Sequence, residues 1–135
     1  MSTLGSKELL VLRLNAICKC LNTLYNINWG GCCWIAYCIA DILHNKGINY
    51  TLVICDEFPV TDFKKLDCSV NHIYIEVDGE SINKGDFESC EISKIHNVSP
   101  EEIENYYNKG RWCSIYNRYK NTFIQKLIND MINNV

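Results

Sequence analysis

The feature that most constrains the fold is a hairpin pattern near the middle of the sequence. Residues 71–77 read NHIYIEV, which alternates as a half-buried strand does. Asp78 and Gly79 come next, and Asp-Gly is a strong signal for a tight turn between two antiparallel strands. The following residues, ESINKGDF, continue as the returning strand. A chain with this hairpin is expected to build an antiparallel sheet and to cover one face of it.

Two helix patterns precede the hairpin. Apolar residues recur at helical spacing over 7–26, after Ser6 as the expected N-cap. They recur again over 32–46, and Gly47 is a suitable residue to end that second helix. Residues 48–55, INYTLVIC, are short, β-branched and apolar, so they predict a buried strand.

Two further helix patterns follow the hairpin, and two segments beside it are less clear. The segment 56–70 predicts a loop, with an edge strand as an alternative, and 90–98 (CEISKIHNV) is ambiguous. Ser99 as N-cap and Pro100 at the first helical position predict a third helix, and 111–132 predict a long fourth one. The order of two helices, a small antiparallel sheet and two helices is that of an α+β fold.

Size and charge exclude several classes of protein. The 135 residues, with no repeat and no Pro/Gly/Ser-rich linker, fit a single domain over 1–135. A net charge of −3 with scattered Lys and Arg gives no case for nucleic-acid binding. No apolar run is long enough for a membrane span, and the first residues do not resemble a signal peptide. The oligomeric state is left open.

The cysteine content points to a reducing compartment. There are nine cysteines, an odd number that cannot pair fully within one chain, and several lie within helix or strand patterns. We therefore expect a cytoplasmic protein with mostly reduced thiols. The many Asn, Ile, Lys and Tyr residues are typical of an A/T-rich genome, and a phage-encoded chain would act in its host's cytoplasm.

The sequence NWGGCCW at 28–34 carries the chemistry. Cys32 and Cys33 fall at the first turn of a predicted helix, where unpaired backbone N–H groups lower a thiol pKa and can stabilise an oxyanion. The two preceding glycines let a substrate approach the backbone closely. Adjacent helical side chains point about 100° apart, so the two thiols cannot play the same part. A buried structural cysteine is the alternative for each of them.

A cysteine nucleophile needs a base, which is usually a histidine oriented by a third polar group. His72 begins the strand of the hairpin, and Asp86 should lie opposite or diagonal to it on the returning strand. Asp86 is therefore the expected orienting residue, and Asn83 is a weaker candidate. His44 lies about three helical turns from Cys33, too far to serve, given the rise per turn.

These residues resemble a family. GCCWIAYCIA resembles the Gly-X-Cys-Trp-X-Phe-Ala block of papain-like enzymes, and HIYIEVDGESINKGD resembles the block of transglutaminase-like enzymes in which a His leads a strand and an Asp follows on its partner. GGCC also resembles a block of arylamine N-acetyltransferases. The resemblance covers roughly 26–87, and it implies Cys33 as nucleophile, His72 as base and Asp86 as the residue that orients it.

The resemblance also implies the other parts of a site. Papain-like enzymes carry a Gln before the Cys that helps form the oxyanion hole; here Asn28 is the candidate replacement, beside the Cys33 N–H. Gly31, Cys32 and Trp34 would line the site. The expected activity is attack on an amide or peptide bond through a thioester, in a protease or a deamidase.

Several alternatives stay open. The same triad serves transglutaminases and acyltransferases, and the same fold without activity would be a binding or inhibitor module with the C-terminal helices as its surface. We expect a protein or peptide substrate and no cofactor. Structural zinc is disfavoured, because no Cys or His spacing in the chain matches a tetrahedral site.

Overall fold

The computed structural model describes residues 5–25, 32–66, 70–85, 90–108 and 122–134. The elements follow in the order α1 (Ser6–Tyr25), α2 (Cys32–Asn45), β1 (Thr51–Asp56), the 3-10 helix η1 (Phe63–Lys65), β2 (His72–Val77), β3 (Glu80–Ile82), β4 (Glu91–Ile95), α3 (Pro100–Asn108) and α4 (Thr122–Asn133). The fold is α+β, as predicted. Its four strands form one antiparallel sheet in the order β3-β2-β1-β4.

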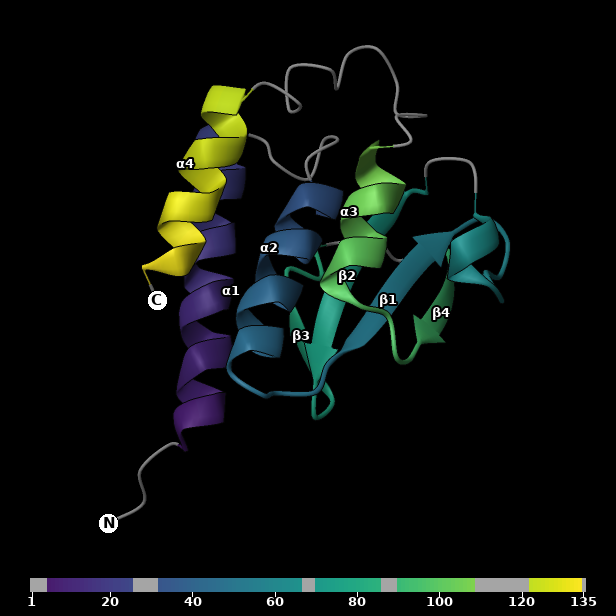
Figure 1. Cartoon of the computed structure of the whole chain (residues 1–135), viewed down its shortest axis with the longest axis horizontal. Helices are drawn as coiled ribbons and strands as arrows, with labels where there is room; N and C mark the ends of the chain where they lie inside the picture. The colour runs from purple at the N-terminus through teal and green to yellow at the C-terminus, as the bar shows by residue number, and fades with distance from the viewer. Residues whose placement is uncertain (1–4, 26–31, 67–69, 86–89, 109–121, 135) are drawn as a thin grey trace.

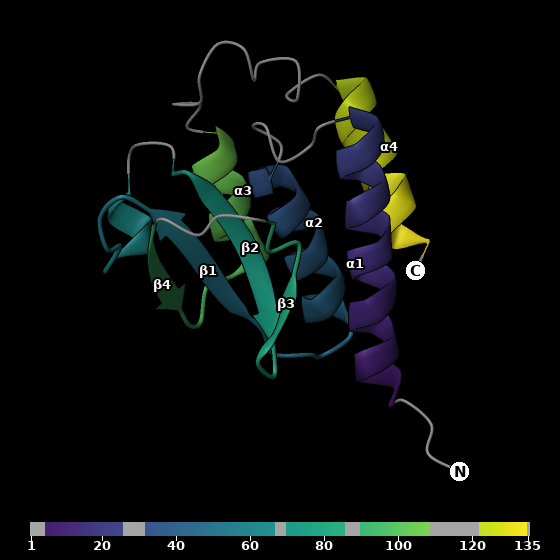
Figure 2. The ribbon, with the colours of Figure 1, turned by 180° about the vertical axis from the view of Figure 1, so that it is seen from behind.

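The described helices cover one face of the sheet. In Figure 1, α2 and α3 lie over the strands, α1 runs beside β3, and α4 packs against α1 and α2. Figure 2, seen from behind, shows the strands in front of α2 and α3. The main core lies between the two layers. Its central sheet residues are Leu52, Ile54, Ile73, Ile75 and Val77, all with 0 or 1% of their surface exposed.

The opposite face of the sheet carries a second, smaller cluster. Because side chains alternate along a strand, the residues between those of the main core point away from the helices. Val53, Cys55 and Tyr74 form this cluster, with Cys90 packed against it. His72 lies two residues before Tyr74 and stacks on its ring, with the ring centroids 5.8 Å apart. The imidazole of His72 therefore belongs to the face that α2 does not cover.

The predicted hairpin forms, but its second strand is short. Asp78 and Gly79 have φ angles of 51° and 84°, the left-handed conformations that a two-residue hairpin turn requires. Val77 pairs with Glu80 directly after the turn. The ladder stops at Ile82, so of the predicted strand over 80–87 the described residues 80–85 confirm only the first three. Asn83 follows with φ 67°, which takes the chain out of the sheet.

The helix ends agree with the sequence, with one correction. Gly47, predicted to end the second helix, has φ 72°, and the N–H of Ile48 donates to the carbonyl of Leu43 at 2.9 Å, as in a Schellman motif. Ser6 is already helical and is not the N-cap. The carbonyl of Gly5 instead accepts the first hydrogen bond of α1.

The remaining predictions concern the segments on either side of the hairpin and the two C-terminal helices. Ser99 caps α3 as predicted, accepting from the N–H of Glu102 at 3.2 Å and donating to its carboxylate at 3.3 Å. The ambiguous segment 90–98 supplies β4, which pairs with β1. Of the segment 56–70, Asp56 ends β1, and the described remainder contains η1 and no strand. The predicted fourth helix is described only as α4, because residues 109–121 lie outside the described part.

Candidate active site

The first turn of α2 sends its two thiols to different neighbours. The sulfur of Cys32 is hydrogen-bonded to the backbone of Ile73 on β2. The Sγ of Cys33 lies 3.9 Å from the carbonyl oxygen of Ile103 on α3. This divergence follows from the roughly 100° between consecutive helical side chains. Of the two thiols, Cys32 is therefore the one that contacts the strand beginning with His72.

Cys32 lies where backbone N–H groups converge. The backbone of Ile73, of Cys33 and of Cys32 itself all lower the pKa of this thiol, as hydrogen-bond donors to a thiolate do. Burial acts in the opposite direction and raises that pKa to about 11. β3 pairs with β2 only between Ile75 and Val77, so Ile73 lies beyond the end of β3. Burial outweighs these backbone groups, so the thiol of Cys32 is protonated at neutral pH.

Cys33 and Trp34 lie within the helical layer. Cys33 has no exposed surface, and burial raises its pKa well above the ordinary value. Trp34 packs between Tyr37 and Tyr107, with ring centroids 4.9 and 5.2 Å away. The indole N–H of Trp34 is buried and has no hydrogen-bond partner in the part of the chain that the structure describes.

His72, the first residue of β2, is held by a backbone carbonyl. Its Nε2 lies 2.7 Å from the carbonyl oxygen of Asn83. A carbonyl oxygen only accepts, so Nε2 must carry a hydrogen, and in the neutral ring Nδ1 is then the basic nitrogen. Burial lowers the pKa of His72, and the hydrogen bond to Asn83 opposes that shift. The ring is therefore neutral and in one tautomer at physiological pH.

Asn83 is fixed in turn by α1. Its backbone N–H donates to Oδ1 of Asn15 at 3.0 Å, and its side-chain oxygen accepts from Asn22 at 3.1 Å. Asn15 also donates to the carbonyl of Ser81 at 2.8 Å. Asn15 and Asn22 are two helical turns apart, so both reach the same side of α1. We call these two residues the asparagine clamp. The clamp holds the turn that orients His72.

The predicted site residues are thus partly assembled. The structure places Cys32 beside the backbone of Ile73, the residue after His72, and it gives His72 an orienting carbonyl from Asn83. The imidazole of His72 itself lies on the other face of the sheet, against Tyr74. Asn28, Gly31 and Asp86 lie outside the described residues, so their roles stay predictions.

The role of Cys33 as nucleophile also stays a prediction. Among the described contacts, its sulfur meets α3 at Ile103 and not His72. As the residue that orients His72, Asn83 is a weaker candidate by sequence than Asp86, and Asn15 belongs to no motif. The group that holds His72 is a backbone carbonyl, and because every residue has one, the residue type at position 83 does not predict this contact. Asn15 is one of several polar residues in the α1 sequence, so no sequence signal distinguishes it.

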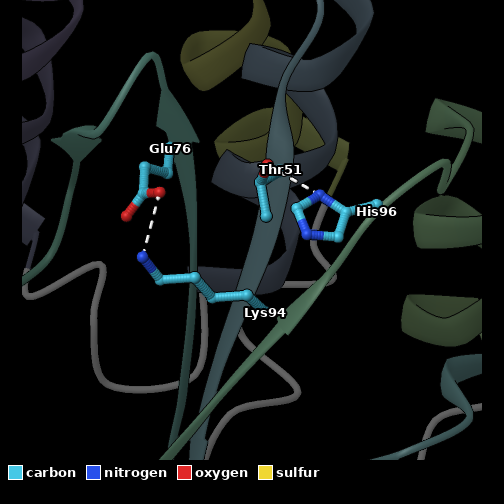
Figure 3. A network of polar contacts seen from close by, with 4 residues as sticks. All are labelled: Thr51, Glu76, Lys94 and His96. Carbon is cyan, nitrogen blue, oxygen red and sulfur yellow. Dashed lines mark hydrogen bonds and ion pairs between the residues drawn. The ribbon is translucent and has the colours of Figure 1, made fainter.

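A second polar cluster lies at the other end of the sheet. Thr51 Oγ1 and His96 Nδ1 are 3.3 Å apart, and Lys94 reaches across to Glu76 with 3.2 Å between Nζ and Oε1 (Figure 3). Thr51, Glu76 and His96 border a pocket of about 650 Å³. Its other polar lining residues are His44, Asn49, Tyr50, Asp78, Asn97 and Ser99. No spacing in the sequence predicts this pocket, because its walls come from three separate connections.

Other types of site find little support. The described residues hold no group of three or more His, Cys, Asp or Glu side chains arranged to bind a metal ion. None of the described helices combines the length and the apolar character that crossing a membrane demands. Comparison with family models, with curated proteins and with solved structures gives no match to this chain.

Proposed function

We propose that this chain is a cysteine-dependent hydrolase or acyl-transfer enzyme that acts on an amide or peptide bond through a thioester. The observation that carries the proposal is the hydrogen bond from His72 Nε2 to the Asn83 carbonyl. It leaves Nδ1 as the basic nitrogen on the strand that the Cys32 thiol touches. The resemblance to papain-like and transglutaminase-like enzymes supports the same reading of this region.

In this proposal His72 acts as a general base. A thiol with a pKa of about 11 is protonated at neutral pH, so it loses its proton only as it attacks the carbonyl carbon. His72 Nδ1 accepts that proton and later returns it to the leaving amine, which requires the imidazole to turn from its place against Tyr74 toward α2. The N–H groups at the start of α2 stabilise the oxyanion. Water then releases the acid in a protease or deamidase, whereas an amine completes the reaction in a transglutaminase.

The two thiols are separate candidates for the nucleophile. The contacts favour Cys32, which meets β2 and three backbone donors. The family blocks favour Cys33, which precedes Trp34. We take Cys32 as the nucleophile and Cys33 as the alternative. In either case the first turn of α2 supplies the thiol and His72 takes its proton.

Thiol reactivity tests the proposal. The intact chain is treated with limiting iodoacetamide at about pH 8, and the modified cysteines are located by mass spectrometry. We expect one thiol of the α2 doublet to react faster than Cys20, an exposed thiol on α1. That preference should disappear in His72→Gln. Cys32→Ser and Cys33→Ser show which of the two thiols carries the reactivity.

The same labelling experiment can also refute the proposal. Labelling that is fastest at Cys20, and unchanged by His72→Gln, would refute the cysteine-enzyme proposal. Because His72 is buried, the variant is first compared with wild type by circular dichroism. If it does not fold, the pH dependence of labelling in the wild type replaces it. Because burial lowers the pKa of His72, a reaction that depends on this base should persist further into the acid range than the ionisation of an ordinary histidine allows, whereas unassisted thiols follow their own ionisation.

A binding module is the second candidate, and the pocket near His96 favours it. A pocket of about 650 Å³ has the size of small-ligand sites and lies away from Cys32. If the α2 thiols prove unreactive, NMR shifts confined to His44 and His96 during a screen of small polar compounds would support this function instead. Shifts spread evenly over the chain would refute it.

A further inference from the structure

Two thiols meet on the face of the sheet that the helices do not cover. Cys55, in β1, pairs in register with Ile92 of β4. Cys90 precedes Ile92 by two residues, so it is the diagonal neighbour of Cys55 on the same face. The two residues pack in one cluster, and their thiols share a hydrogen bond. Both are in the thiol form.

The pair is asymmetric in exposure and in charge. Cys55 is buried, with 2% of its surface exposed, whereas Cys90 is half-buried and can be reached from solvent. Burial and the neighbouring Cys90 raise the pKa of Cys55 to about 12, and the ammonium of Lys84 acts in the opposite direction. A reagent in solution therefore reaches the thiol of Cys90 first, and the thiol of Cys55 lies buried next to it. This is the arrangement of an attacked cysteine with its resolving partner.

We propose that Cys55 and Cys90 form a redox-sensitive pair that closes to a disulfide when the protein meets a peroxide. The register places the two residues as diagonal neighbours on one face of the sheet, where Cys90 packs against the cluster that contains Cys55. The thiol with access to solvent and the thiol without it are already in contact. This inference does not depend on the proposed enzyme activity, because neither thiol belongs to the first turn of α2.

The chemistry balances with a peroxide as the oxidant. The sulfur of Cys90, as thiolate, attacks one oxygen of hydrogen peroxide; the O–O bond breaks, hydroxide leaves, and Cys90 becomes a sulfenic acid. The sulfur of Cys55 then attacks that sulfur; the S–S bond forms, the S–O bond breaks, and water leaves with the thiol proton. Two thiols and one peroxide give one disulfide and two waters.

Peptide mapping tests the pair directly. Cleavage after Lys and Arg separates Cys55, in residues 47–64, from Cys90, in residues 85–94, and each peptide contains a single cysteine. The folded full-length chain is treated with hydrogen peroxide, blocked with an alkylating reagent, digested and analysed without reduction. We expect the two peptides to appear as one linked species that dithiothreitol separates.

Variants decide the remaining outcomes. In Cys90→Ser the linked species should vanish and Cys55 should stay alkylatable, whereas Cys20→Ser should leave the link unchanged. In Cys55→Ser, Cys90 should proceed to sulfinic acid, which gives a second readout if Cys90→Ser is unstable. Disulfide closure should also raise the melting temperature by roughly 5–12 °C. Linkage of Cys90 to any other peptide, or oxidation of Cys20 with Cys55 and Cys90 both intact, would overturn the proposal.

Discussion

Replacement of Asn15 by Ala tests whether the asparagine clamp holds the turn beside His72. The change removes two hydrogen bonds, one to the N–H of Asn83 and one to the carbonyl of Ser81. Each contributes about 1 kcal/mol, and the N–H of Asn83, a residue only 6% exposed, loses its partner at a cost of about 1 kcal/mol more. The better helix propensity of Ala returns about 0.5 kcal/mol. The net loss of unfolding free energy is about 2.5 kcal/mol.

Urea denaturation measures this loss, and the matching fall in melting temperature is about 9 °C for a domain of this size. Thr23→Ala on the same helix is the control. It gains similar helix propensity and loses only an exposed hydrogen bond to the Lys19 carbonyl, so its stability should stay near that of wild type. A nitrogen-15 NMR spectrum of the histidines adds a local readout, because His72 should lose its single tautomer when the turn loosens. If Asn15→Ala were as stable as Thr23→Ala, the clamp would not hold the turn.

Three further predictions concern other parts of the fold. Burial lowers the pKa of His72, so below about pH 6.5 the unfolded chain binds more protons than the native one. Stability should therefore fall as the pH drops through that range, and His72→Gln should show a smaller fall in urea titrations at several pH values. Gly47→Ala should cost about 1 kcal/mol of stability from backbone strain alone, because φ is 72° and nothing lies within 4 Å of the added carbon. Ser99→Ala should cost about 1 kcal/mol through the lost cap of α3, again measured with urea, and an unchanged midpoint would show that the cap is not needed.

Local patterns predicted the elements well, because their causes are local. The alternation of NHIYIEV predicted β2, the Asp-Gly pair predicted the turn, and Gly47 marked the end of α2. The extent of β3 was not predictable in the same way. Asn83 leaves the sheet with a left-handed φ and hydrogen-bonds to α1, a partner 68 residues away. Nothing within the hairpin sequence encodes that contact.

The sequence predicted the elements that carry the candidate residues but not the contacts those residues make. The sequence indicated a thiol at a helix start and a histidine at a strand start, and both lie at the same end of β2. Which thiol of the doublet meets β2 depends on how α2 is rotated about its axis, and that rotation is set by packing against α3. The group that orients His72 is a main-chain carbonyl, so residue identity at position 83 says little about it.

The asparagine clamp has a consequence for the order in which the molecule folds. The β2–β3 hairpin closes through neighbours a few residues apart and can form early, whereas the contacts from α1 to Ser81 and Asn83 span 66 and 68 residues. Closing a loop of that length has an entropic cost that is offset only once α1 is docked. The turn that orients His72 should therefore become rigid in the last steps of folding. In the native state, the docking of α1 sets how often the histidine is held in place.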